Sequence, residues 1–145
     1  MANGELELFH AILAKRYPQR VPTESEVQFF EQNTNVSGMG ADDKTVVLNP
    51  IAKMAPNAFA AVLKNERVRL FLDESKLNPP ITISDKQREI AKSWGGPYSS
   101  DDSLLRKTII ARILSGDLSL GPYDASQLEW ARRLVSRSVG KRPSG

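Results

Sequence analysis

One carboxylate in this sequence lies where a helix is expected to face a hydrophobic core. Residues 55–74 carry apolar side chains at helical spacing, and the stripe consists of Phe59, Val62, Leu63 and Leu70. Glu66 falls in the middle of this stripe. A lone buried carboxylate costs several kcal/mol, roughly, unless it is paired or protonated. Glu66 is therefore a candidate buried carboxylate.

Three interpretations of Glu66 are open. It forms a structural ion pair, with Arg112 or His10 as candidate partners, or its tip stays in water at the edge of a wide stripe. Alternatively, burial raises its pKa and it acts as a general acid or base. If Glu66 belongs to a buried ion pair, Glu66→Gln should lower the stability near neutral pH.

No other pattern forms a recognisable catalytic, cofactor or metal site. His10 is the single histidine, and the chain has no cysteine, which excludes disulfides, thiolate nucleophiles and Cys-ligated metals. The acidic pairs at 42–43 and 101–102 lack the spacing of a calcium loop. The glycines at 38–40 are too close together for a phosphate loop. We therefore expect a protein that is not an enzyme and has no cofactor and no metal.

Positive charge gathers near the C-terminus. The chain has 20 Lys and Arg against 17 Asp and Glu, a net charge of +3, and the five cations and two acids of residues 124–145 account for that net charge. On the helix expected there, one face carries Trp130, Arg133 and Arg137. This face is predicted to be solvated or to contact an acidic partner protein, and the alternative is that it contacts a nucleic acid. The candidate nucleic-acid contacts are Arg133, Arg137, Lys141 and Arg142.

Length and composition predict one ordinary globular domain. The 145 residues are 40% hydrophobic and 26% charged, which is typical of a folded soluble chain. Glu5 and Glu7 interrupt the N-terminal apolar run, so it does not resemble a secretory signal, and no run approaches the roughly 18 apolar residues of a membrane span. We expect a soluble protein without a membrane partner, found in the cytoplasm when it is made.

Apolar spacing and capping residues place the helices. One helix is expected over 5–17, a short one follows the capping box at 23–26, and Pro56 begins the helix at 55–74. A second capping box at 84–87 opens a helix that ends in a mobile loop at 95–97. A strongly apolar helix follows and ends at Gly116, and the last helix opens at 124–127. Its core side is predicted to consist of Leu128, Ala131, Val135 and Val139.

Residues 35–50 change from helical to β character. Gly38, Gly40 and the acidic pair at 42–43 indicate turns, and a β-branched run follows them. The pattern predicts a small hairpin. Because two strands alone are not stable in water, the hairpin should pack on the 55–74 helix or pair with another chain. Its edge is a candidate protein contact, formed by Val46, Val47 and Leu48.

Four short segments resemble small uncharacterised proteins encoded by tailed bacteriophages. They are VVLNP at 46–50, KNERVRLFL at 64–72, IIARILSGD at 109–117 and ASQ at 125–127. The resemblance carries no catalytic motif and assigns no functional residue. It implies a component of the virion or of its assembly that works through contacts.

These patterns predict a mainly α fold of five or six helices with one short β-hairpin, in a single domain over 1–140 with a flexible basic tail at 141–145. The function hypothesis is a non-enzymatic structural or accessory protein that acts through protein–protein contacts, as a part of a phage virion or its assembly. Its partners would be further copies of this chain or virion proteins, in the host cytoplasm or in the virion. The competing hypothesis is a nucleic-acid-binding accessory protein that uses the C-terminal helix and tail.

Overall fold

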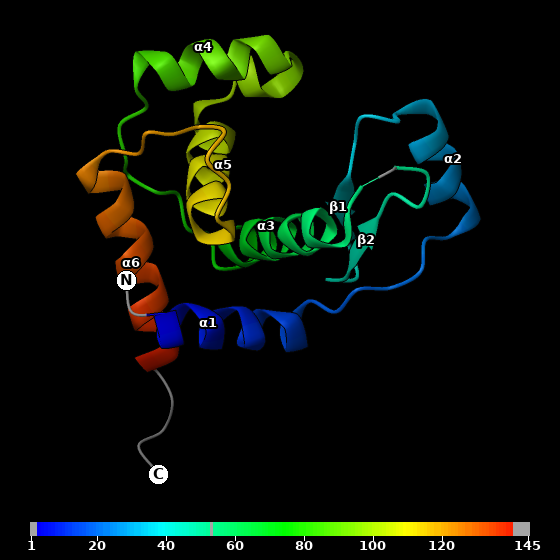
Figure 1. Ribbon diagram of the computed structural model, residues 1–145, viewed down its shortest axis with the longest axis horizontal. Helices are drawn as coiled ribbons and strands as arrows, with labels where there is room; N and C mark the ends of the chain where they lie inside the picture. The colour runs from blue at the N-terminus through cyan, green and yellow to red at the C-terminus, as the bar shows by residue number, and fades with distance from the viewer. Residues whose placement is uncertain (1–2, 53, 141–145) are drawn as a thin grey trace.

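The computed structural model describes residues 3–52 and 54–140, and six α-helices, one 3₁₀-helix and a two-stranded hairpin form within them (Figure 1). The elements are α1 Asn3–Arg16, α2 Glu24–Gln32, β1 Gly38–Gly40, β2 Val46–Leu48, α3 Pro56–Glu74, α4 Asp85–Trp94, η1 Gly96–Ser99, α5 Asp102–Ser115 and α6 Ala125–Gly140. The predicted mainly α fold with one short hairpin is confirmed. The predicted tail, with Lys141 and Arg142, lies outside the described residues.

Local capping groups set the ends of several helices as predicted. Thr23 with Glu26 and Ser84 with Gln87 form complete capping boxes, in which the side chain of each partner bonds the backbone of the other. Gly116 ends α5 in the left-handed conformation, with φ of 79°. These signals are local in sequence, which is why they predict the helix ends well.

The predicted loop after α4 is more regular than expected. Gly95 ends the helix with φ of 73°, but the next four residues form η1 instead of an irregular loop. Trp94 and Tyr98 pack edge to face across this turn, with ring centroids 5.5 Å apart.

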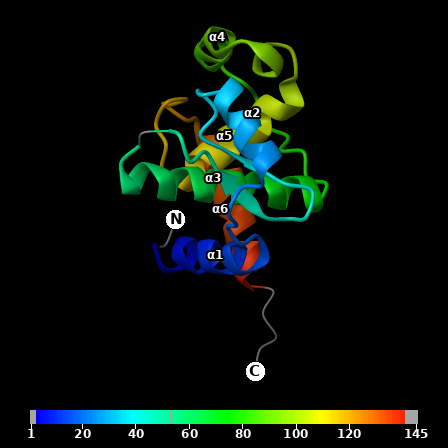
Figure 2. The same cartoon turned by 90° about the vertical axis from the view of Figure 1, so that its right-hand side faces the viewer.

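Helix α3 lies at the centre of the molecule. It packs on α5, α1 and both strands, and α1 and α3 lie side by side in both views (Figures 1 and 2). The fully buried residues of α3 are Val68 and Leu72, rather than the predicted stripe. That stripe faces the hairpin instead: a side chain at Gly38 would meet Val62, and one at Gly40 would meet Leu70. All four residues of the stripe are half-buried in this position.

Helix α6 closes the core on the side of α1 and α5. Ala131, Val135 and Val139 are buried as predicted. The prediction that Leu128 belongs to the core is wrong, because its side chain is exposed, with a relative exposure of 45%. Leu134 is buried instead. The reason lies in the first turn of α6. Gln127 there hydrogen-bonds toward α4, and Leu128, about 100° further around the helix, is turned away from that contact.

Candidate functional site

The predicted free edge of the hairpin is partly covered by an earlier segment of the chain. Val46 donates its N–H to the carbonyl of Pro18, and its carbonyl accepts the N–H of Arg20, both over 3.0 Å. Gln19 and Val46 thereby form a parallel bridge. The side chains of Val46 and Val47 are fully buried. In this structure the side chains of both valines are therefore buried and residues 18–20 occupy the backbone of Val46, while their contact with a partner protein stays a prediction.

The edge of β2 is open at Leu48. The strands pair in the register Gly38 to Leu48, and Asn49 donates its N–H to Ser37 over 2.9 Å. Successive residues of an antiparallel strand direct their N–H and C=O groups to alternate sides. Leu48 therefore directs both groups away from β1, like Val46 two residues earlier. No described residue hydrogen-bonds either backbone group of Leu48.

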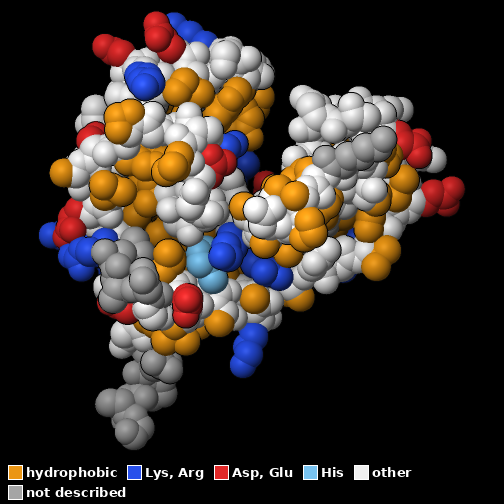
Figure 3. Space-filling model, in the orientation of Figure 1, with side chains coloured by type: hydrophobic (Ala, Val, Ile, Leu, Met, Phe, Trp, Pro, Cys, Tyr) orange, Lys and Arg blue, Asp and Glu red, His pale blue; other side chains and the backbone are white. Residues whose placement is uncertain are grey.

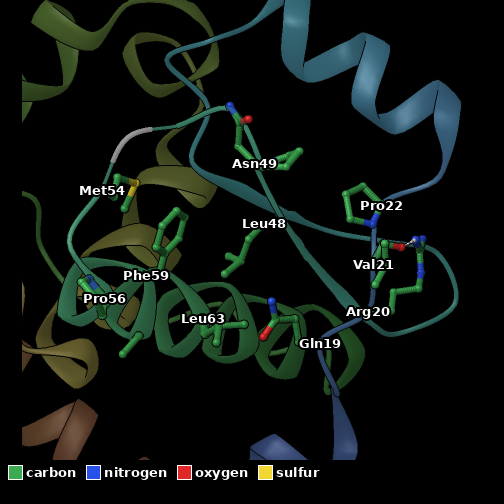
Figure 4. A pocket seen from close by; sticks show the side chains of 12 residues that line it. Gln19, Arg20, Val21, Pro22, Leu48, Asn49, Met54, Pro56, Phe59 and Leu63 are labelled. Carbon is green, nitrogen blue, oxygen red and sulfur yellow. Dashed lines mark hydrogen bonds between the residues drawn. The ribbon is translucent and has the colours of Figure 1, made fainter.

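An apolar groove opens where the covering segment leaves β2. It has a volume of about 730 Å³ and lies between residues 19–22, the end of β2 and the first turns of α3. Figure 4 shows Phe59 and Leu63 on the α3 side, Val21 and Pro22 on the opposite side, and Leu48 between them. Val21 is 84% exposed, although it is apolar. The groove thus combines an unpaired strand edge with apolar walls.

Arg20 holds the outer wall of the groove in place. Its Nε donates to Asp43 Oδ2 at 3.0 Å and to Thr45 Oγ1 at 2.8 Å. Its two terminal nitrogens donate to the two carboxylate oxygens of Glu26, at 2.6 and 2.9 Å. Hydrogen bonds from Arg20, and then from the backbone of Thr23, lower the pKa of Glu26 to about 2. The extended segment is tied in this way to both the hairpin turn and α2.

A second hollow, the polar cleft, lies between residues 35–38 on one side and α4, η1 and α5 on the other, with α3 along it. Its volume is about 730 Å³. Figure 3 shows the surface hollowed between the two sides, with acidic and basic side chains in the hollow. The polar residues that line it include Asn65, Glu66, Arg69, Tyr98, Arg112 and Asp117.

The structure places Glu66 in this cleft. Its side chain is 16% exposed and lies 3.7 Å from a terminal nitrogen of Arg69, too far for a hydrogen bond. Burial raises the pKa of Glu66, and the nearby charges of Arg69 and Arg112 oppose that rise only in part. Glu66 is thus a half-buried carboxylate whose ion pair does not offset its burial.

Neither predicted partner bonds Glu66. His10 instead contacts the carbonyl of Leu114 through Nε2 at 2.7 Å, and burial lowers its pKa. Arg112 bonds Asp117 at 2.5 Å and lies over the ring of Trp94, 4.7 Å from its centroid. The predicted pairs with His10 and Arg112 are wrong because stronger local contacts hold both side chains elsewhere.

The predicted contact face on α6 is less basic than its sequence suggests. Trp130 is half-buried against the core, and Glu129 pairs with Arg132 at 2.6 Å and with Arg133 at 3.0 Å. These bonds lower the pKa of Glu129 to about 2. Arg137 is exposed and forms no ion pair with any residue of the described part. Because the single charge of Glu129 offsets only one arginine, the three arginines of Ala125–Gly140 leave a net charge of +2 on the helix.

Two prolines in the sequence could have indicated the segment that forms one wall of the groove. Pro18 and Pro22 bracket residues 19–21, and each proline holds the backbone around it extended. An extended segment of this kind is suited to cover a strand edge. The two prolines do not reveal that the segment pairs with β2 only at Val46 and then separates from the strand.

Within residues 3–52 and 54–140, no three His, Asp or Glu side chains are grouped to hold a metal ion. No helix in the same residues is both long and apolar enough to cross a bilayer. Neither a protein-family model, nor a curated protein, nor a solved structure matches this chain. The resemblance to phage proteins consequently stays a prediction.

Proposed function

We propose that this chain is a non-enzymatic accessory protein that binds an extended, apolar segment of a partner protein in the groove beside β2. The observation that carries the proposal is the open edge at Leu48, whose backbone N–H and C=O have no partner in the described chain and which lines an apolar groove. An edge of this kind is a template for another strand, because an incoming backbone supplies the missing donor and acceptor.

The groove walls define what the segment should look like. In an extended chain, alternate side chains point to one face, so every second residue of the segment would contact Phe59 and Leu63. Each buried apolar side chain contributes about 1.5–3 kcal/mol, while each backbone hydrogen bond contributes a net of about 1 kcal/mol. The apolar side chains therefore supply most of the affinity, and the hydrogen bonds fix the direction and register.

A phage virion or its assembly is the setting that we propose for this activity, and its support is the sequence resemblance alone. We do not extend the proposal to nucleic acid. Glu129 holds Arg132 and Arg133 in ion pairs, and three arginines against one glutamate give the described part of α6 a net charge of only +2, a weak basis for binding phosphates.

The test compares two matched surface variants. Peptides selected from a random library against the wild-type protein are titrated by calorimetry against Val21→Lys, in the groove, and Leu118→Lys, outside it. Both positions are highly exposed, at 84% and 80%, so neither change should unfold the protein. We expect peptides with alternating apolar residues, whose affinity falls at least about tenfold in Val21→Lys, or about 1.4 kcal/mol, and stays within about twofold in Leu118→Lys.

Equal binding to both variants, or no enrichment of any peptide, would contradict the proposal. Light scattering measures the mass of the protein without peptide. If the wild-type protein is a dimer and Val21→Lys is a monomer, the partner is a second copy of this chain.

A further inference from the structure

We propose that the polar cleft, which is separate from the apolar groove, binds a guanine base against the Glu66–Arg69 pair. The ligand is a planar, uncharged ring with a hydrogen-bond acceptor next to two N–H donors on one edge. This site is independent of the proposed partner-binding groove, so each can fail without the other.

The charges of the cleft favour an uncharged ligand. Arg69 and Arg112 line it together with Glu66 and Asp117, so two cations face two acids. An added anion would meet the acids and an added cation would meet the arginines, with little net gain in either case. Neutral groups that donate and accept hydrogen bonds fit this arrangement better than ions do.

Several polar groups of the cleft have unused bonding capacity. No described residue hydrogen-bonds the Glu66 carboxylate, and Arg69 makes one long hydrogen bond, 3.4 Å, to the hydroxyl of Tyr98. The side-chain oxygen of Asn65 is buried, and no described group donates to it. Glu66 and Arg69 line the cleft with hydrogen-bonding capacity that the described chain does not use, so a ligand there would gain hydrogen bonds from them.

The order of these groups along α3 selects the base. Arg69 is a donor and Glu66 an acceptor, and they lie 3.7 Å apart. The pairing edge of guanine carries the O6 acceptor beside the N1 and N2 donors, so Arg69 would donate to O6 while the two oxygens of Glu66 accept from N1 and N2. Adenine, whose edge pairs a donor with an unprotonated ring nitrogen, would place an acceptor against Glu66.

The aromatic wall supplies a surface for the flat ring. Tyr98 lies beside the Glu66–Arg69 pair, since Arg69 donates to its hydroxyl, and it packs edge to face on Trp94, one face of which the guanidinium of Arg112 already covers. Bases stack readily on such side chains, which contributes about 1–3 kcal/mol per base. A cleft of about 730 Å³ is large enough for a nucleoside, since small-molecule sites typically span about 300–1,000 Å³.

The test is an NMR titration of the full chain with guanosine, inosine and adenosine. Inosine lacks the N2 amino group, so it isolates one of the two donors. We expect saturable shifts at Glu66, Arg69 and Tyr98 with guanosine, binding at least about tenfold weaker in Glu66→Gln, and an unchanged affinity in Glu89→Gln, whose side chain is exposed on α4 outside the cleft. Inosine should bind more weakly than guanosine.

Equal responses to guanosine and adenosine, an unaltered affinity in Glu66→Gln, or no shifts in the cleft would each overturn the proposal. A further titration distinguishes the source of the base. If single-stranded DNA with one guanine among thymines binds the cleft more tightly than guanosine, the source is a nucleic acid, and if it does not, the source is a free nucleoside.

Discussion

Glu66 shows how a single residue can occupy a costly position without being held by a strong partner. Its carboxylate is half-buried, Arg69 approaches only to 3.7 Å, and burial raises its pKa above the usual value of 4.5. The folded state therefore holds the proton of Glu66 more tightly than the unfolded state does. This residue contributes stability in its protonated form, and that contribution is lost as the pH rises from about 4.5 through the raised pKa.

Replacement of the Glu66 carboxylate should raise the stability of the protein at neutral pH, whereas loss of a buried ion pair would lower it. Glu66→Gln keeps the shape but removes the cost of burying a charge, so we expect it to be more stable than the wild-type protein at pH 7 and about equally stable near pH 4. Urea unfolding across this pH range measures the difference. Glu89→Gln, on the surface, is the control and should follow the wild-type profile, whereas a less stable Glu66→Gln at pH 7 would restore the ion-pair interpretation.

Gly38 allows the hairpin to approach α3. A Cβ at this position would lie 2.9 Å from Val62 and 3.0 Å from Leu48. Since Val62 has a single favoured rotamer in a helix, it cannot move away easily. We expect Gly38→Ala to lower the free energy of unfolding by about 1–3 kcal/mol, whereas Gly4→Ala in α1, where nothing lies within 4 Å, should be neutral or stabilising. Chemical denaturation of both variants measures this, and equal stability would show that the strands lie further from α3.

At the scale of elements, the starts of α4 and α6 are joined by a buried pair of amides. Gln87 and Gln127 are almost fully buried, and each donates its side-chain amide to the other, at 3.0 and 2.8 Å. Each also belongs to the cap of its own helix, since Ser84 and Asp124 donate their backbone N–H groups to them. The amide pair thereby fixes where both helices begin and how they sit together.

Removal of one glutamine should leave the other with unpaired buried groups. We expect Gln87→Ala or Gln127→Ala to cost about 1–3 kcal/mol, and the double variant to cost less than the sum of the two. Unfolding free energies of the two single variants and the double variant form the test, with Gln28→Ala on the exposed side of α2 as the control. Strict additivity would show that the two amides do not act as a pair.

The same elements show what the sequence can and cannot predict. Some features depend only on residues that are close in sequence: the capping boxes, the helix stop at Gly116 and the existence of the hairpin. The sequence patterns were therefore sufficient to predict them. The Gln87–Gln127 contact joins residues 40 positions apart, and each looked like a simple helix cap. Leu128 has the right spacing for the core, but its burial depends on which neighbour covers the first turn of α6.

At the scale of the whole molecule, the two candidate sites lie where separate segments come close without closing completely. The groove exists because residues 18–20 cover β2 at Val46 and then leave it before Leu48. The polar cleft exists because residues 35–38 and α5 face each other along α3. Sequence patterns predicted a usable edge at 46–48, and tertiary structure decided that only its last residue is open.

The most direct test of the proposed function is the rate of amide hydrogen exchange at Leu48 in the protein without a partner. The N–H of Val46 is bonded to Pro18 and that of Val47 faces Met39, so both should be protected. We predict that the Leu48 amide exchanges much faster than these two neighbours and becomes protected when a selected peptide binds. Protection of Leu48 equal to that of Val47 in the free protein would mean that the edge is closed, and would contradict the proposed binding mode.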